Sequence, residues 1–163
     1  MPPRLIFGAG SIGYSPEGFT YTWRTPEDVS DLLEVLKRLG LTELDSAAVY
    51  PPGAPFGADR LLGQSKAAEK GFVVGTKAML DAEKMMGPDP EPQLDYDALL
   101  SSINQQLEAI GVEKLALFYA HWPDAHTPIE VQAEAFDRLH KAGKFEKVSV
   151  SVPKVSICCP SND

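Results

Sequence analysis

Short apolar runs alternate with amphipathic stretches along almost the whole chain, and this alternation limits the folds open to it. The runs predict strands at residues 5–7, 41–45, 72–77, 115–119 and 148–152. The stretches between them predict helices at residues 26–39, 58–70, 97–110 and 128–140, with a proline-rich loop at residues 79–93. Strands that alternate with helices form parallel sheets with right-handed crossovers. We therefore predict an α/β fold built on a parallel sheet.

Capping residues mark the ends of the predicted helices. Thr25 and Thr127 each precede a proline, an order typical of an N-cap followed by the first helical residue. Asp28 stands three residues after Thr25, as in a capping box. Glycines stand after the predicted helices at positions 40, 71, 111 and 143, where glycine commonly ends a helix.

The composition is that of a globular chain. It has 163 residues, 44% of them hydrophobic, which argues against disorder. The net charge is −8 and no basic cluster interrupts it, so we expect neither nucleic acid nor a membrane surface as a partner. No apolar run approaches the roughly 20 residues of a membrane span, and no apolar leader follows Met1. These features favour a cytoplasmic protein.

The two cysteines, Cys158 and Cys159, are adjacent. Neighbouring cysteines rarely reach disulfide geometry without strain, and no Cys/His spacing suggests a metal site. We interpret them as reduced thiols, with a redox role as the alternative.

Four polar residues stand at or just after predicted strand ends: Asp45, Tyr50, Lys77 and His121. Function concentrates at the carboxyl ends of parallel strands, so we expect these side chains to face one mouth of the fold. Each alone has a plainer explanation as a cap, a packing group or a solvated charge. Their joint placement on successive strands predicts a site.

These four residue types suit the reduction of a carbonyl group. A hydride that reaches the carbonyl carbon leaves charge on oxygen, and Tyr50 can donate the proton that oxygen needs. A phenol has a pKa of about 10, and we predict that the Lys77 ammonium lowers it. Asp45 can hold Lys77, and His121 can orient the carbonyl. The hydride itself requires a nicotinamide cofactor.

Longer stretches around these residues resemble the aldo-keto reductases. The matching stretches are residues 44–50, 62–63, 75–77, 107–112, 121–124 and 141–145. Residues 50–53 and 139–145 are similar to the aflatoxin-aldehyde-reductase branch of that family. The resemblance implies a (β/α)8 TIM barrel that binds NADPH and reduces aldehydes or ketones to alcohols.

The resemblance also implies roles for individual residues. It carries the catalytic tetrad of the family onto the four strand-end residues. It implies cofactor contacts at Asp45 and Ser151, and substrate contacts at Tyr50, His121 and Trp122. For Trp122, packing beside its loop is an equally good interpretation.

Other polar residues of this region are expected to have structural roles. We expect Asp124 to brace its loop rather than react. His126 and His140 stand at a predicted helix start and helix end, and we interpret both as structural or solvated.

The resemblance extends over residues 4–151. We therefore interpret residues 1–151 as the N-terminal half of a reductase barrel and residues 152–163 as a divergent tail. Val152 stands where the family has an asparagine that contacts the nicotinamide carboxamide. Such barrels need about 250 residues. Five strands cannot close an eight-stranded barrel, and the open edges favour self-association.

Three interpretations of this short extent stay open: a gene-model or splicing artefact, an expressed fragment that pairs with another chain, or a free-standing weak relative. The functional alternatives follow from them. The first is an NADPH-dependent reductase whose activity is impaired because the cofactor-binding half is missing. The second is a non-catalytic half-barrel that acts through association. A third, a barrel enzyme in which Lys77 forms a Schiff base, fits the motifs less well.

Overall fold

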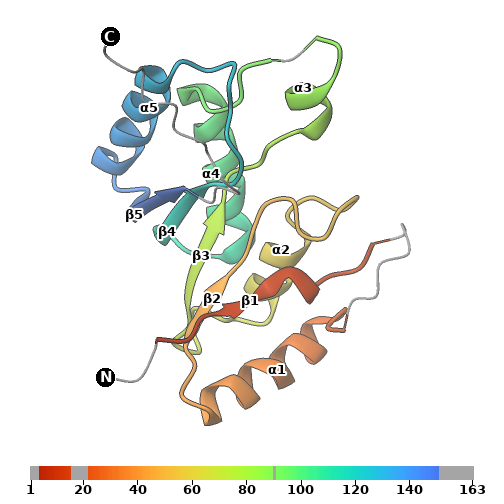
Figure 1. Ribbon diagram of the computed structural model, residues 1–163. Helices are drawn as coiled ribbons and strands as arrows, with labels where there is room; N and C mark the ends of the chain where they lie inside the picture. The colour runs from red at the N-terminus through yellow and green to blue at the C-terminus, as the bar shows by residue number, and fades with distance from the viewer. Residues whose placement is uncertain (1–3, 16–21, 90, 151–163) are drawn as a thin grey trace, which may run out of the picture.

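The computed structural model describes residues 4–15, 22–89 and 91–150 (Figure 1). The strands are β1 (Phe7–Gly8), β2 (Glu43–Asp45), β3 (Val73–Lys77), β4 (Leu115–Ala120) and β5 (Phe145–Val150). The helices are α1 (Pro26–Arg38), α2 (Gly57–Gln64), α3 (Ala82–Met86), α4 (Tyr96–Ile110) and α5 (Ile129–Lys141), with a short 3-10 helix, η1 (Ala9–Ser11).

The five strands form one parallel sheet in the order β1-β2-β3-β4-β5. Each strand pairs with the next one along the chain, so all five carboxyl ends lie at the same edge of the sheet. Gly75 of β3 lies between Asp45 of β2 and Leu117 of β4, and Leu117 pairs in turn with Lys147 of β5. The predicted α/β fold with a parallel sheet is confirmed.

The helices pack against one face of the sheet and against one another. Leu44, Val74 and Phe118 of the three central strands are buried in the same apolar cluster as Leu33 of α1 and Ile103 of α4. Along the chain, α1 contacts α2, α2 contacts α4, and α4 contacts α5 (Figure 1). Among the described residues, α1, α2, α4 and α5 lie on this side of the sheet, and the opposite face borders a cavity of about 410 Å³.

The contact between α2 and α4 is close enough to require glycine. A Cβ atom placed on Gly63 would lie 2.1 Å from the backbone oxygen of Ala109. No side chain fits in that space without moving one of the two helices. Gly63 therefore sets the distance between α2 and α4.

The predicted start of α1 is confirmed in detail. The Thr25 hydroxyl accepts a hydrogen bond from the backbone N–H of Asp28, and the Asp28 carboxylate accepts one from the N–H of Thr25. The two bonds form a capping box and satisfy N–H groups that a helix leaves free at its start. In α4, Asp95 is the N-cap, and Gly111, with a φ of 78°, ends the helix as predicted.

The predicted helix at residues 58–70 is too long, because α2 ends at Gln64. Lys66 adopts the left-handed conformation with a φ of 57°. Its N–H donates to the Gly63 carbonyl, and the N–H of Ala67 donates to the Leu62 carbonyl. This is a Schellman motif, in which glycine is the usual left-handed residue. Because a lysine stands there and not a glycine, the sequence did not predict the end of α2.

Two further boundaries differ from the prediction. The Thr127 hydroxyl donates to the Asp124 carboxylate and does not cap α5, whose N-cap is Pro128 with no side-chain bond. The short helix α3 lies within the predicted loop, and the Asp81 carboxylate caps it. In both places a nearby carboxylate accepts hydrogen bonds from backbone N–H groups or from a hydroxyl.

The last strand begins three residues before the predicted start at residue 148. Phe145 is buried, and its ring lies 5.6 Å from that of Phe118 and 6.4 Å from that of Phe136. Two exposed charged residues follow, Glu146 and Lys147. Because they interrupt the apolar run, the sequence did not predict the start of β5. Residues 151 and 152 of the predicted strand lie outside the described residues, as do Cys158, Cys159 and the rest of the predicted tail.

Candidate active site

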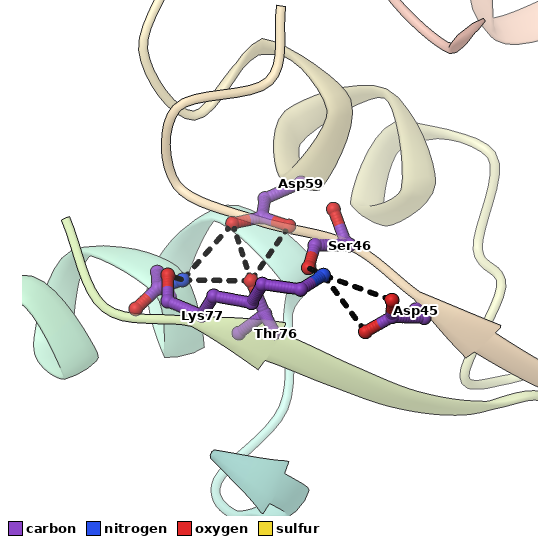
Figure 2. Close-up of polar contacts among 6 residues, drawn as sticks. Asp45, Ser46, Asp59, Thr76 and Lys77 are labelled. Carbon is purple, nitrogen blue, oxygen red and sulfur yellow. Dashed lines mark hydrogen bonds and ion pairs between the residues drawn. The ribbon is translucent and has the colours of Figure 1, made fainter. Parts of the chain in front are cut away.

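The carboxyl ends of β2 and β3 bring Asp45 and Lys77 into contact. The Lys77 ammonium lies 2.9 Å from both carboxylate oxygens of Asp45 and donates to the backbone carbonyl of Ser46 at 2.7 Å (Figure 2). Lys77 is 5% exposed, whereas the side chain of Asp45 is 32% exposed. The pair therefore has a buried cationic end and an anionic end that reaches solvent.

Tyr50 and His121 lie beside this ion pair, on the loops after β2 and β4. The Lys77 ammonium is 5.2 Å from the centroid of the Tyr50 ring. The rings of Tyr50 and His121 meet edge to face, with centroids 5.9 Å apart. The four strand-end residues predicted from the sequence thus lie together.

The pKa of Tyr50 is raised, in contrast to the predicted lowering by Lys77. Burial of the phenol is the main cause, and the Asp45 carboxylate adds to it. Because Asp45 balances the charge of Lys77 at 2.9 Å, the pair presents little net positive charge to the phenol. Tyr50 is consequently protonated at neutral pH and holds the proton that a donor needs.

The pKa of His121 is lowered to about 4, so the imidazole is neutral at pH 7. Burial is the main cause, and the Lys77 ammonium acts in the same direction. Among the described residues, Nδ1 of His121 is buried and has no hydrogen-bond partner. A neutral imidazole keeps one N–H that can donate to an oxygen.

Two cavities border residues of the site. One, of about 550 Å³, is bordered by Tyr50, His121 and Trp122. Trp122 is 48% exposed, and its ring lies 5.9 Å from that of His121. The other, of about 410 Å³, lies on the face of the sheet opposite α2 and α4 and is bordered by Asp45 and Tyr119. Ser151, the other predicted cofactor contact, lies outside the described residues.

Asp124 braces the loop that carries His121 and Trp122. Its carboxylate accepts hydrogen bonds from the backbone N–H groups of Gln93, Leu94, His126 and Thr127, and from the Thr127 hydroxyl. Burial acts to raise the pKa of Asp124, but these bonds together outweigh it and lower the pKa to about 2. His126 and His140 are exposed.

Three residues close to Lys77 were not predicted from the sequence. Tyr119 pairs with Lys77 across β3 and β4, and its ring centroid lies 5.4 Å from the ammonium. Asp59 of α2 and Gln106 of α4 are fully buried behind β3. A polar residue on an apolar helix face was the available signal, since Gln106 stands between Ile103 and Leu107 in the sequence.

In the part of the chain that the structure describes, no group of three or more His, Cys, Asp or Glu side chains could hold a metal ion. Within the same residues, no helix is both long and apolar enough to cross a membrane.

The fold and these side chains define a class of protein. The sheet is the first part of a (β/α) barrel, and its strand ends hold a phenol, an ammonium–carboxylate pair and a neutral imidazole. The sequence model of the Aldo/keto reductase family matches residues 4–159. The chain therefore belongs to the aldo/keto reductase family.

Sequence relatives agree with the family assignment. An aldo-keto reductase of Pseudocercospora fijiensis is 36% identical over 73% of this chain and 38% of its own length. An oxidoreductase of Leptosphaeria maculans is 32% identical over 91% of the chain and 42% of its own length. Human aflatoxin B1 aldehyde reductase member 2 is 30% identical over 99% of the chain and 43% of its own length. The chain thus spans about two fifths of the length of these relatives.

A solved structure shows the same fold. An aldo-keto reductase from Bacillus halodurans, in its holo form, superposes with a TM-score of 0.66 at 18% sequence identity. The superposition covers 90% of this chain and 46% of that one. The described sheet and helices are therefore a partial TIM barrel, as predicted.

Proposed function

We propose that this chain carries the proton-donating part of an NADPH-dependent reductase that converts aldehydes or ketones to alcohols. The observation that supports it is the cluster formed by the Lys77–Asp45 ion pair with Tyr50 and His121 at one end of the sheet. A protonated phenol and a neutral imidazole border the same cavity. These are the groups that a carbonyl oxygen needs as it gains negative charge.

Each residue has a separate role in this proposal. Tyr50 donates the proton to the oxygen of the substrate. Lys77 stabilises the phenolate that remains, and Asp45 holds Lys77 in place. His121 donates a hydrogen bond that orients the carbonyl, and Trp122 provides an apolar wall for the substrate beside it.

The cofactor is proposed to contact Asp45 and Ser151. The residues beside the ion pair fit a nicotinamide ring in one respect: the solvent-reaching Asp45 carboxylate borders an open cavity of about 410 Å³. The reduced nicotinamide supplies a hydride when it is bound. We expect this chain alone to bind NADPH weakly and to turn over slowly, because Asp45 is the one predicted cofactor contact among the described residues.

A second function, association with another copy of the chain, is supported by the edge of the sheet. Val148 and Val150 of β5 are more than half exposed and border an apolar groove of about 630 Å³ beside α5. An exposed apolar edge strand favours pairing with another chain. In this role the chain would be a half-barrel without activity of its own.

The reductase proposal is tested by substituting the proton donor. Tyr50→Phe should lower the turnover of 4-nitrobenzaldehyde with NADPH by about 100-fold or more, because general acid catalysis contributes at least that much. NADPH binding, measured by fluorescence quenching, should not change. Tyr14→Phe is the matched control, because Tyr14 is an exposed tyrosine outside the site.

Two results would contradict the proposal. Unchanged turnover in Tyr50→Phe would remove Tyr50 from the reaction. A wild-type chain with no turnover that forms stable dimers would favour the association role instead. Micromolar NADPH binding would contradict only the expectation that the chain binds its cofactor weakly.

A further inference from the structure

A buried polar cluster lies behind β3, on the face of the sheet opposite the Lys77 ammonium. Its members come from three elements: Asp59 from α2, Thr76 from β3, and Ser102 and Gln106 from α4. Asp59, Thr76 and Gln106 have no solvent-exposed surface, and Ser102 is 3% exposed. Burying a polar group costs free energy unless the group is hydrogen-bonded. The hydrogen bonds among these four side chains therefore decide whether the cluster is stable.

The hydrogen bonds of the cluster run in one direction. The N–H of Met79 donates to the Ser102 hydroxyl at 2.7 Å, and that hydroxyl donates to the Gln106 side-chain oxygen at 3.1 Å. The Gln106 amide donates to the Thr76 hydroxyl at 2.7 Å. The Thr76 hydroxyl in turn donates to the Asp59 carboxylate at 3.3 Å, which ends the chain of bonds as its acceptor.

The same cluster holds the backbone on both sides of the Lys77 side chain. The Gln106 amide also donates to the Lys77 carbonyl at 2.9 Å, and the N–H of Ala48 donates to that carbonyl at 3.1 Å. With Thr76 before it and Met79 after it also bonded, the end of β3 is fixed at three points. Figure 2 shows the result: Thr76 points to Asp59 on one side, and Lys77 extends to Asp45 and Ser46 on the other.

We propose that Asp59, Thr76 and Gln106 form a positioning unit that holds Lys77 against Asp45 and the carbonyl of Ser46. None of the three touches the reacting atoms, so they act through Lys77 alone. The catalytic consequence rests on the proposed reductase function, but the position of Lys77 can be measured without it.

Loss of a hydrogen bond within this unit should change the position of Lys77. Removing the Thr76 hydroxyl takes a donor from the Asp59 carboxylate and one acceptor from the Gln106 amide, which keeps the Lys77 carbonyl as an acceptor. Burial already raises the pKa of Asp59, so this carboxyl is sensitive to any lost donor. We expect Gln106 to shift when it loses its bond to Thr76, and Gln106 holds the Lys77 carbonyl.

The test measures how accessible the Lys77 amine is in the full chain. Lysines are methylated with formaldehyde and a borane reductant, and the rate at each lysine is read by peptide mass spectrometry. Thr76→Val keeps the shape of the side chain and removes its hydroxyl. We expect methylation of Lys77 to become about tenfold faster, while Lys66, an exposed lysine, reacts at its wild-type rate.

Three further variants separate positioning from simple stability. Thr76→Ser keeps the hydroxyl and should leave Lys77 at the wild-type rate. Gln106→Met should raise it as Thr76→Val does, which gives a second measurement if one variant folds poorly. Ile103→Val removes one buried methyl group from α4 without touching the cluster, and it should not change the rate at Lys77.

The outcomes decide whether the cluster positions Lys77 or only stabilises the fold. If Thr76→Val or Gln106→Met folds and leaves Lys77 protected, or if Ile103→Val exposes Lys77 equally, the cluster only stabilises the fold and the proposal is wrong. If Lys77 is exposed as expected in a chain that shows no turnover, the positioning role stands and the reductase proposal fails. If the chain is active, Thr76→Val should lower kcat more than it raises KM, and Thr76→Ser should restore it.

Discussion

The centre of the sheet and its β5 edge are built in opposite ways. Around β3, buried polar side chains are bonded to one another on one face, and an ion pair stands on the other. At β5, a cluster of aromatic rings around Phe145 holds the strand, and Val148 and Val150 face outward to solvent. The centre is specified by directional bonds, whereas the edge is specified by apolar contact on one side alone.

This difference shows which part of the fold depends on exact geometry. A hydrogen-bonded cluster tolerates little displacement, because each donor needs its acceptor at about 3 Å. An apolar edge tolerates change as long as its inner side stays packed. Substitutions at the centre should therefore have larger effects than comparable ones at the edge.

The largest expected effect on stability is at the backbone contact of α2 with α4. Gly63→Ala places a Cβ against the Ala109 carbonyl and should lower the free energy of unfolding by about 3 kcal/mol, at the upper end of overpacking costs. Gly143→Ala, between α5 and β5, meets no atom within 4 Å and has only its left-handed φ of 75° to strain, at a cost of about 1 kcal/mol. Urea unfolding measures both. Equal losses would mean that the two regions are equally constrained.

A smaller effect is expected where the two regions join, at Asp124. Its pKa is about 2 when folded and near 3.9 when unfolded, so its stabilisation is complete above pH 4 and is lost as the pH falls towards 2. The difference in unfolding free energy between the wild type and Asp124→Asn should shrink by about 2 kcal/mol between pH 5 and pH 2. A difference that stays constant with pH would show that the bonds of Asp124 do not depend on its charge.

The smallest effect on stability is expected at the edge. Val148→Lys should change the unfolding free energy by less than about 0.5 kcal/mol, because the side chain is already exposed. It should nevertheless weaken self-association in sedimentation experiments. Val131→Lys is the control, since Val131 is an exposed valine of α5 that does not border the groove. Equal weakening by both variants would indicate a general effect of charge.

The sequence predicted the features that depend on local patterns. The alternation of strands and helices gave the parallel sheet, and Thr25 with Asp28 gave the start of α1. The four strand-end residues could be grouped because parallel strands share one edge. Their assigned roles stay predictions.

What the sequence could not supply depends on partners distant in the chain. Asp59 and Gln106 are 47 residues apart, and only the folded packing of α2 on α4 brings them together. The raised pKa of Tyr50 depends in the same way on burial and on how closely Asp45 pairs with Lys77. Lys66 ends α2 in a conformation that favours glycine, and no rule of composition marks such a lysine.

The order of the strands in the sheet equals their order in the chain, and this has a consequence for folding during synthesis. Each new strand pairs with the strand synthesised just before it. The segment between two paired strands is therefore a single connection, and the entropy cost of closing it is modest. The ion pair can form once Lys77 has left the ribosome, but the end of β3 gains its full set of anchors only when Gln106 has followed. The anchoring of Lys77 is therefore completed only after α4 has been synthesised.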